Sequence, residues 1–500
     1  MEARDRTTRR RWLARWALSC GFAVALGAAA CSDKTGETSG LAATAGVPGA
    51  AANGGSGGVA ILPSAGSGGV PSAGAGAGGM PAPGSGGASG GAGTPAPAGA
   101  SGGGGAGGED AGMSEDGLRD VLLVGNGVAG TVSFLDARTF ENLGSVDVIP
   151  DFDEVMDLIS GDLLRSVAYS AIKNAQLLHH FEPSGGDRFL DDVFVSPDGG
   201  VLYVSRSNLG DVAAFDLTRP GHPQLWRSFV SGLKADHATI SHDGKRLVVS
   251  ATTATVADVF DASNGERIDT FATGDFPHQN DYSADGKHIY NSSIGNVGYQ
   301  SVSYANNDQK GTRLLVKVDA QTLDAVGMWQ FEWGIRPNVI TADEKLMYAQ
   351  LSYLNGVIKY DLGESRELAR SDQPLSEFAM STYAGYDEYP HDSAHHGLAL
   401  SGDGARLCDC GTIDNTVTIV ATATMTVEAT IDVGMVPYWA TTSPEGTRCF
   451  VSLSGDDAIS VIDHAEGEQV TVVPVGDFPQ RSRLGRLPEA VVSGLLAAGG

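Results

Sequence analysis

A short phrase that recurs six times constrains the fold of this chain more than any other feature of its sequence. Each copy has an apolar strand, a turn of Ser or Thr followed by Asp or Glu and usually Gly, and a second apolar strand. Alternating apolar residues on both sides of an Asp/Gly turn are typical of a β-hairpin. The copies are VFVSPDGGVLYVS (193–205), TISHDGKRLVVS (239–250), DYSADGKHIYNS (281–292), VITADEKLMYAQ (339–350), LALSGDGARLCDC (398–410) and ATTSPEGTRCFVS (440–452).

A second phrase, a strand that usually ends near Asp, follows the hairpins and occurs seven times. Its copies are TVSFLDA (131–137), DVAAFDL (211–217), VADVFDA (256–262), LLVKVDA (314–320), GVIKYDL (356–362), TVTIVAT (416–422) and AISVIDH (458–464). The first copy lacks a complete hairpin before it, because the chain enters the repeat at DVLLVGNG (120–127), already on a second strand. We therefore expect the C-terminal VGDFPQRSRLGRL (475–487) to supply the missing strand.

These repeats predict an all-β fold, a seven-bladed β-propeller closed by a C-terminal strand that pairs into the first blade. Such closure buries strand edges that would otherwise be exposed. A β-helix or open solenoid is the alternative, but its units are shorter and need no strand returned from the far terminus. The predicted propeller spans residues 118–488, and residues 489–500 are left as a C-terminal tail.

The turn phrases quoted above resemble those of the YVTN-type propeller family, which includes lactonase-like and surface-layer members. The resemblance covers residues 118–487. It implies the seven-bladed fold. It implies little about function, because one architecture hosts binding modules and unrelated enzymes alike.

Three segments depart from the repeat. Residues 150–186, between blades one and two, have apolar residues at helical spacing and predict a helical insertion. Residues 293–312 lengthen a loop within blade four, and residues 363–395 lengthen the connection into blade six. Insertions of this kind commonly become surface loops that shape a binding face.

The N-terminal segment is predicted to export and tether the propeller. Residues 1–30 have an Arg-rich start, the apolar run WALSCGFAVALG and small residues before Cys31, a pattern of a bacterial signal peptide and lipid attachment. TRRRWL (8–13) leaves both the twin-arginine and the general export route open. Residues 31–117 are rich in Gly, Ala, Ser and Pro and predict a disordered linker. We expect an exported lipoprotein of the bacterial cell envelope, on the outer membrane or facing the periplasm.

The formal net charge of −27 argues against nucleic acid as a partner, because phosphate binding needs a basic surface. The expected partners are an envelope protein or a small-molecule ligand, together with the membrane through the lipid anchor. We expect a monomer.

Candidate site residues lie four to six positions before each turn, where the innermost strands begin and the mouth of a propeller channel is expected. This rule places polar residues from all blades in one ring: Asp191, Asp192, Asp236, His237, His278, Arg336, His395, His396, Trp439 and Arg481. Three blades deliver histidines to it, although the chain has only 11. The alternative is an ordinary hydrated polar lining.

A multi-histidine metal site is the sharper hypothesis. His237, His278 and His396 are equivalent in the repeat, with His391 and His395 as further candidates. Neutral imidazole suits Cu, Zn or Fe, and Asp236 or Asp392 could orient a ligand. His179 and His180 would join if the helical insertion folds over the channel. Noncovalent haem is a second version of this idea, whereas covalent c-type haem is excluded because no Cys-x-x-Cys-His occurs.

The cysteines of the repeat region predict one disulfide. Cys408 and Cys410 share one face of a strand in blade six, and Cys449 has the opposite parity in blade seven. Because neighbouring blades pack with unlike faces together, Cys449 is expected to pair with Cys408 or Cys410.

Two function hypotheses follow. The first is an envelope lipoprotein whose propeller is a binding or interaction platform, because no specific catalytic motif stands out. The second is a metal- or haem-dependent oxidoreductase with the multi-histidine site at the channel mouth. Acid–base catalysis without a metal would draw on Asp191, Asp192, His237, His278 and Arg336.

Overall fold

The structure is a computed structural model that describes residues 117–177, 187–297 and 304–499. The predicted signal peptide, Cys31, the linker, His179 and His180 lie outside the described residues. Within the described residues, no helix has the length and apolar character needed to span a membrane.

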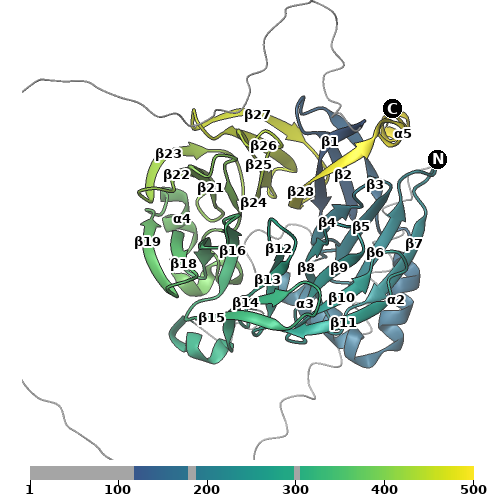
Figure 1. Ribbon diagram of the computed structural model, residues 1–500, viewed down its shortest axis with the longest axis horizontal. Helices are drawn as coiled ribbons and strands as arrows, with labels where there is room; N and C mark the ends of the chain where they lie inside the picture. The colour runs from purple at the N-terminus through teal and green to yellow at the C-terminus, as the bar shows by residue number, and fades with distance from the viewer. Residues whose placement is uncertain (1–116, 178–186, 298–303, 500) are drawn as a thin grey trace, which may run out of the picture. The chain divides into compact units, whose positions relative to one another are not determined.

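Seven four-stranded antiparallel sheets form a ring (Figure 1), which confirms the predicted seven-bladed β-propeller. From the innermost strand outward, the blades are β28 (Pro479–Pro488), β1 (Leu118–Asn126), β2 (Thr131–Asp136) and β3 (Asn142–Asp147); β4 (Asp192–Val195), β5 (Val201–Arg206), β6 (Asp211–Asp216) and β7 (Gln224–Phe229); β8 (Ala235–Ile240), β9 (Arg246–Ala251), β10 (Val256–Asp261) and β11 (Arg267–Ala272); β12 (Pro277–Tyr282), β13 (His288–Ser293), β14 (Arg313–Asp319) and β15 (Ala325–Phe331); β16 (Ile335–Ile340), β17 (Leu346–Leu351), β18 (Gly356–Asp361) and β19 (Arg366–Asp372); β20 (Leu398–Leu400), β21 (Arg406–Gly411), β22 (Thr416–Ala421) and β23 (Thr426–Asp432); β24 (Pro437–Thr442), β25 (Arg448–Leu453), β26 (Ala458–Asp463) and β27 (Glu468–Pro474).

The repeated Ser and Asp build the turn between the first two strands of a blade. In blade two the Ser196 hydroxyl donates to Asp198 Oδ1 at 2.5 Å and accepts from the amide of Val201 at 3.0 Å. Gly199 in this turn has φ +69°, a left-handed conformation that glycine adopts without steric cost. The turn phrase is therefore structural and requires no functional explanation.

The core lies between neighbouring blades. Leu123 and Phe134 of blade one form one buried cluster with Val193 and Val204 of blade two. Each middle strand is apolar on both faces because both faces are covered, and burial of apolar surface is the main stabilising contribution.

The C-terminal strand closes the ring as predicted. β28 pairs antiparallel with β1 from Leu118 opposite Pro488 to Asn126 opposite Pro479. Residues 489–499, expected only as a tail, form the helix α5 (Glu489–Gly499). Val492 and Leu495 of this helix are buried against Leu143 of blade one. Its apolar residues at helical spacing were the signal that sequence analysis did not use.

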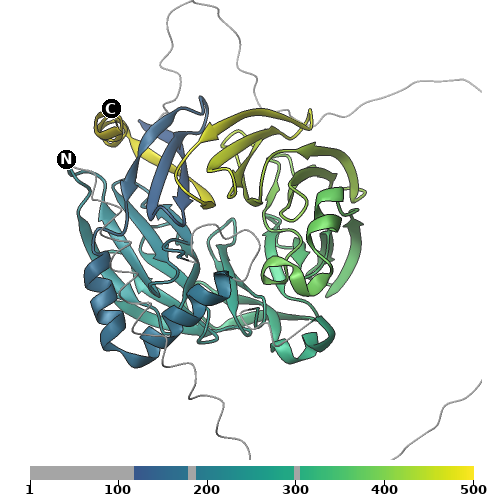
Figure 2. The same cartoon turned by 180° about the vertical axis from the view of Figure 1, so that it is seen from behind.

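The predicted insertions are short helices. The first contains α2 (Phe152–Gly161) and α3 (Leu163–Leu177), as expected for residues 150–186. The loop in blade four contains η1 (Tyr304–Lys310), and the connection into blade six contains α4 (Glu377–Thr382), η2 (Tyr386–Glu388) and η3 (Pro390–Asp392) after β19. Figure 2 shows α2, α3 and α4 on the face of the ring turned toward the viewer.

A disulfide joins blades six and seven. Of the two pairings that the sequence left open, the structure has Cys408–Cys449, with Cα atoms 6.5 Å apart. Cys410 is a buried free cysteine. The bond links adjacent blades whose apolar side chains also form one buried cluster.

We predict that removing this cross-link lowers the free energy of unfolding. It closes a loop of 41 residues, and constraining the unfolded chain in this way contributes roughly 2–4 kcal/mol. Urea unfolding of the Cys408→Ala/Cys449→Ala double variant should show this loss, with Cys410→Ala as the matched control. In differential alkylation, the Cys410 peptide should be labelled in denaturant before reduction and the other two only afterwards. Labelling of all three before reduction would contradict the pairing.

Candidate functional site

The innermost strands bring buried polar side chains from six blades to the centre of the ring. Asp236 and His237 lie on β8, His278 on β12 and Arg336 on β16, while Arg481 lies on β28. We define the mouth cluster by its members: Asp191, Lys234, Asp236, His237, His278, Arg336, His396, Trp439 and Arg481.

Three imidazoles meet in this cluster, as the repeat positions predicted. The ring centroids of His237 and His278 are 4.1 Å apart, and those of His278 and His396 are 5.5 Å apart. His396 also stacks on Tyr438 at 4.2 Å, and its Nδ1 lies 2.9 Å from the Tyr438 carbonyl oxygen. The three rings thus form a contiguous row.

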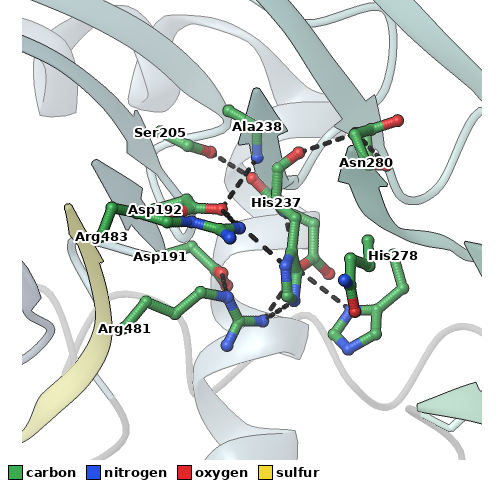
Figure 3. Close-up of polar contacts among 12 residues, drawn as sticks. Asp191, Asp192, Ser205, His237, Ala238, His278, Asn280, Arg481 and Arg483 are labelled. Carbon is green, nitrogen blue, oxygen red and sulfur yellow. Dashed lines mark hydrogen bonds and ion pairs between the residues drawn. The ribbon is translucent and has the colours of Figure 1, made fainter. Parts of the chain in front are cut away.

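The guanidinium of Arg481 occupies the other side of His237 (Figure 3). Its Nη2 donates to His237 Nε2, and its Nε lies 3.0 Å from Asp191 Oδ1. The indole of Trp439 lies 4.7 Å from the guanidinium carbon. Because Nε2 of His237 accepts this hydrogen bond, the proton of the neutral ring is on Nδ1.

The histidines of the cluster are held neutral. Burial lowers the pKa of His278 to about 4, although Asp236, whose Oδ1 lies 3.3 Å from Nδ1, opposes the shift. Burial and the charge of Arg481 also lower the pKa values of His237 and His396 well below the usual range. At neutral pH the row of imidazoles therefore carries no charge.

The pKa values of the two central carboxyl groups are shifted in opposite directions. Burial raises the pKa of Asp191 to about 7, even though Arg481 favours its ionised form. Burial also disfavours the charge on Asp236, but Lys234, His278 and Arg481 outweigh it, and its pKa is lowered. Lys234 Nζ lies 2.9 Å from Asp236 Oδ2. Asp236 is thus a fixed negative charge, whereas burial favours the protonated form of Asp191.

Arg336 is a buried cation that forms no ion pair within 4 Å of a described carboxylate, and only 1% of it is exposed. Its Nε donates to Ser352 Oγ at 3.1 Å, and its Nη2 donates to the carbonyl oxygen of His391. A buried charge that is not matched by an opposite charge is costly. Burial accordingly lowers the pKa of Arg336.

Two of the five predicted histidine ligands lie outside the row. His391 is in η3, where its carbonyl oxygen accepts a hydrogen bond from Arg336. His395 Nδ1 lies 2.9 Å from Asp409 Oδ1, inside blade six. Asp392, predicted to orient a ligand, instead pairs with Lys310.

A transition metal would find one group of three ligands here. Single ligand atoms of Asp236, His237 and His278 all lie within 4.8 Å of one another. Imidazole and carboxylate donors fit such an ion, but Arg481 now occupies Nε2 of His237 and would have to move. Asp285, His288 and Glu344 form a second such group nearer the surface, where Lys317 Nζ lies 2.9 Å from Glu344. Noncovalent haem stays a prediction, because no contact among the described residues tests it.

The rule that selected positions four to six before each turn missed two charged residues of the centre. Lys234 lies one position before the window that gave Asp236, and Arg483 lies two positions after Arg481. In a strand, residues two apart point to the same side, so the alternation in β28 was an available signal for Arg483. Arg483 forms two hydrogen bonds with Asp192, at 2.9 and 2.7 Å.

No family model matches the sequence, and no curated protein matches it. Among solved structures, a putative 6-phosphogluconolactonase from Bacteroides fragilis is 15% identical with a TM-score of 0.51, covering 75% of this chain and 99% of its own. Hydrazine synthase of Kuenenia stuttgartiensis is 19% identical with a TM-score of 0.47, over 67% of this chain and 90% of its own. A dihydro-heme d1 dehydrogenase, NirN, is 13% identical with a TM-score of 0.46, over 75% of this chain and 76% of its own. At these identities the likeness shows the fold alone, and membership of the YVTN-type family stays a prediction.

We predict that His278 makes the metal-free protein sensitive to mild acid. Its pKa is lowered from 6.5 to about 4 in the folded protein. The unfolded chain therefore binds a proton at a higher pH than the folded protein does. The contribution of neutral His278 to the free energy of unfolding is fully present above pH 6.5 and is lost as the pH falls toward 4. Between pH 7 and pH 5 this should cost roughly 2 kcal/mol of the free energy of unfolding. Urea unfolding after chelation should show a smaller loss for His278→Gln than for wild type. His242→Gln, at an exposed histidine, is the control and should keep the wild-type pH dependence; equal losses in all three proteins would contradict the prediction.

Proposed function

We propose that this chain is an exported, lipid-anchored protein of the bacterial cell envelope whose propeller binds a small anionic ligand at the mouth cluster. The proposal develops the binding-platform hypothesis. It makes the protein a binding module, monomeric and independent of nucleic acid, with a carboxylate- or phosphate-type ligand.

One observation carries the choice of an anion: buried positive charge exceeds buried negative charge in the mouth cluster. Lys234, Arg336 and Arg481 are set against Asp191 and Asp236 alone, and Asp191 is partly protonated because its pKa is raised to about 7. In a chain with a net charge of −27, a cationic centre is the opposite of the average surface. The positive charge of this centre attracts an anion, although the rest of the chain is acidic.

A hydrogen-bond donor supports the same choice. Arg481 Nη1 is buried and has no hydrogen-bond partner among the described residues. A buried donor without a partner is costly, and a carboxylate or phosphate oxygen would satisfy it. The geometry of this donor is fixed, since Arg481 is held by Asp191 and Trp439.

We predict that Arg336→Gln weakens anion binding at least tenfold, because it removes the one mouth cation without a carboxylate partner. Succinate, inorganic phosphate and sulfate would be titrated by calorimetry into the full chain purified in detergent. Arg313→Gln is the matched control, since Arg313 is also buried but donates to backbone carbonyl groups away from the cluster. Wild-type affinity in Arg336→Gln, or no saturable binding of any of the three anions to wild type, would refute the proposal.

The second candidate is the metal-dependent oxidoreductase, favoured by the Asp236, His237 and His278 group. It predicts a stoichiometric Cu, Zn or Fe ion in protein purified from its native envelope. Elemental analysis and a visible spectrum test it, and His278→Ala should lose the metal whereas His395→Ala, inside blade six, should keep it. Protein free of metal that still binds an anion would exclude this candidate.

A further inference from the structure

A cavity lies at the opposite ends of the innermost strands from the mouth cluster, toward the Ser-x-Asp-Gly turns. It has a volume of about 410 Å³ and is lined by β12, β16, β20, β24 and β28. This volume is at the lower end of the range for small-molecule sites, roughly 300–1,000 Å³. Ile340, Leu398, Leu400 and Leu484 supply apolar walls, and Trp439 also lines the cavity.

The cavity is separate from the mouth cluster. The side chain of Trp439 stands between them, since it contacts His237 at 5.1 Å between ring centroids while it also lines the cavity. The guanidinium of Arg483 lies 5.0 Å from the Trp439 ring, and that of Arg481 lies 4.7 Å from it. The two arginines come from one face of β28, Arg481 on the mouth side and Arg483 on the cavity side.

The polar groups of the cavity leave one carboxylate with only a distant ion pair, because two carboxylates share the cation of Arg483. Arg483 is already matched by Asp192, with which it forms two hydrogen bonds at 2.9 and 2.7 Å. Asp281 has no cation closer than Arg483 Nη1, at 3.9 Å. Gln279 Nε2 donates to Asp281 Oδ2 at 2.5 Å and thereby fixes the carboxyl group. Glu344 at the rim is matched by Lys317.

Asp281 is accessible from the cavity. Its side chain is 42% exposed, and it lies among the cavity-lining residues. A half-open cavity with apolar walls and one fixed, weakly paired carboxylate is complementary to an apolar molecule with a single positive charge.

We propose that this cavity binds a small organic cation, a primary amine with an apolar body, whose ammonium group pairs with Asp281. The apolar walls contact the hydrocarbon part of the amine. Gln279, which fixes Asp281 at the floor of the cavity, is itself held by hydrogen bonds with the Asn338 backbone at 2.8 and 2.9 Å. The net charge of −27 raises the local concentration of such a cation. This site is independent of the anion site proposed for the mouth cluster.

The test uses three phenylethyl probes of similar shape and different charge. Phenethylamine, 2-phenylethanol and 3-phenylpropionate are titrated into the full chain in detergent, with calorimetry and tryptophan fluorescence as readouts. We expect saturable binding of the amine and at least tenfold weaker binding of the alcohol and the carboxylate. Equal or tighter binding of either analogue, or no saturable binding of the amine, overturns the proposal.

Variants locate the site. Asp281→Asn should weaken amine binding at least tenfold, while Asp243→Asn, at the exposed turn of the blade-three hairpin, should leave it unchanged. Leu400→Trp should weaken the amine by filling the cavity without touching its floor. Amine binding by Asp281→Asn at wild-type affinity overturns the proposal, whatever the result with Arg336→Gln and succinate.

The pH dependence gives an independent readout. Partial burial raises the pKa of Asp281 to about 6; Asp192 adds to this shift, and Arg483 and Gln279 oppose it. The affinity for the amine should therefore rise from pH 5 to pH 7, as Asp281 loses its proton. This rise should be absent in Asp281→Asn, and its persistence there would assign the binding to another group.

Discussion

The pairing of β28 with β1 is the interaction on which the rest of the structure depends. It joins the two ends of the described propeller into one sheet and supplies the fourth strand of blade one. The same strand carries Arg481 and Arg483 into the centre, where they reach Asp191 and Asp192 at the start of blade two. Closure and the polar centre are therefore coupled, because a shift of β28 by one residue would turn both arginines to the other side of the strand.

Buried ions impose the next constraint. Removing a charge from water costs several kcal/mol unless an opposite charge and hydrogen bonds replace the lost hydration. Arg483 meets this requirement through Asp192, with two hydrogen bonds. Arg336 does not meet it with a carboxylate, and it is satisfied only by a hydroxyl and a carbonyl oxygen. Arg336 at the mouth and Asp281 in the cavity both lack a close ion-pair partner. A ligand of opposite charge would therefore add most stabilisation at these two positions.

Sequence reasoning reached the architecture because each blade repeats the same turn chemistry. Ser196 and Asp198 recur at equivalent positions, so the strands, the blades and the convergence of His237, His278 and His396 followed from one alignment of the turns. Parity along the strands also narrowed the disulfide to Cys449 with one of two partners. The insertions and α5 obey no repeat, which is why their contacts with the blades could not be derived.

The repeat does not determine which way an individual charged side chain points or with which residue it pairs. His395 and His396 are adjacent in sequence, yet one ring contacts Asp409 inside blade six and the other lies beside His278. Their separation follows from alternation along an extended backbone, but which of them faces the centre depends on the register of β20. The cavity was likewise hidden, because its floor combines Asp281 and Arg483 from strands about 200 residues apart in sequence.

The indole of Trp439 explains how one narrow centre can contain charge surpluses of opposite sign. Arg481 and Arg483 both lie against this ring, and aromatic faces attract guanidinium groups. The carboxylates divide between the two arginines: Asp191 is paired with Arg481 and Asp192 with Arg483. With those pairs formed, Arg336 remains in excess on one side of the indole and Asp281 on the other. A substitution at either of these residues changes the charge balance of its own side and leaves the Asp191–Arg481 and Asp192–Arg483 pairs in place, so the two ends of the centre can be studied separately.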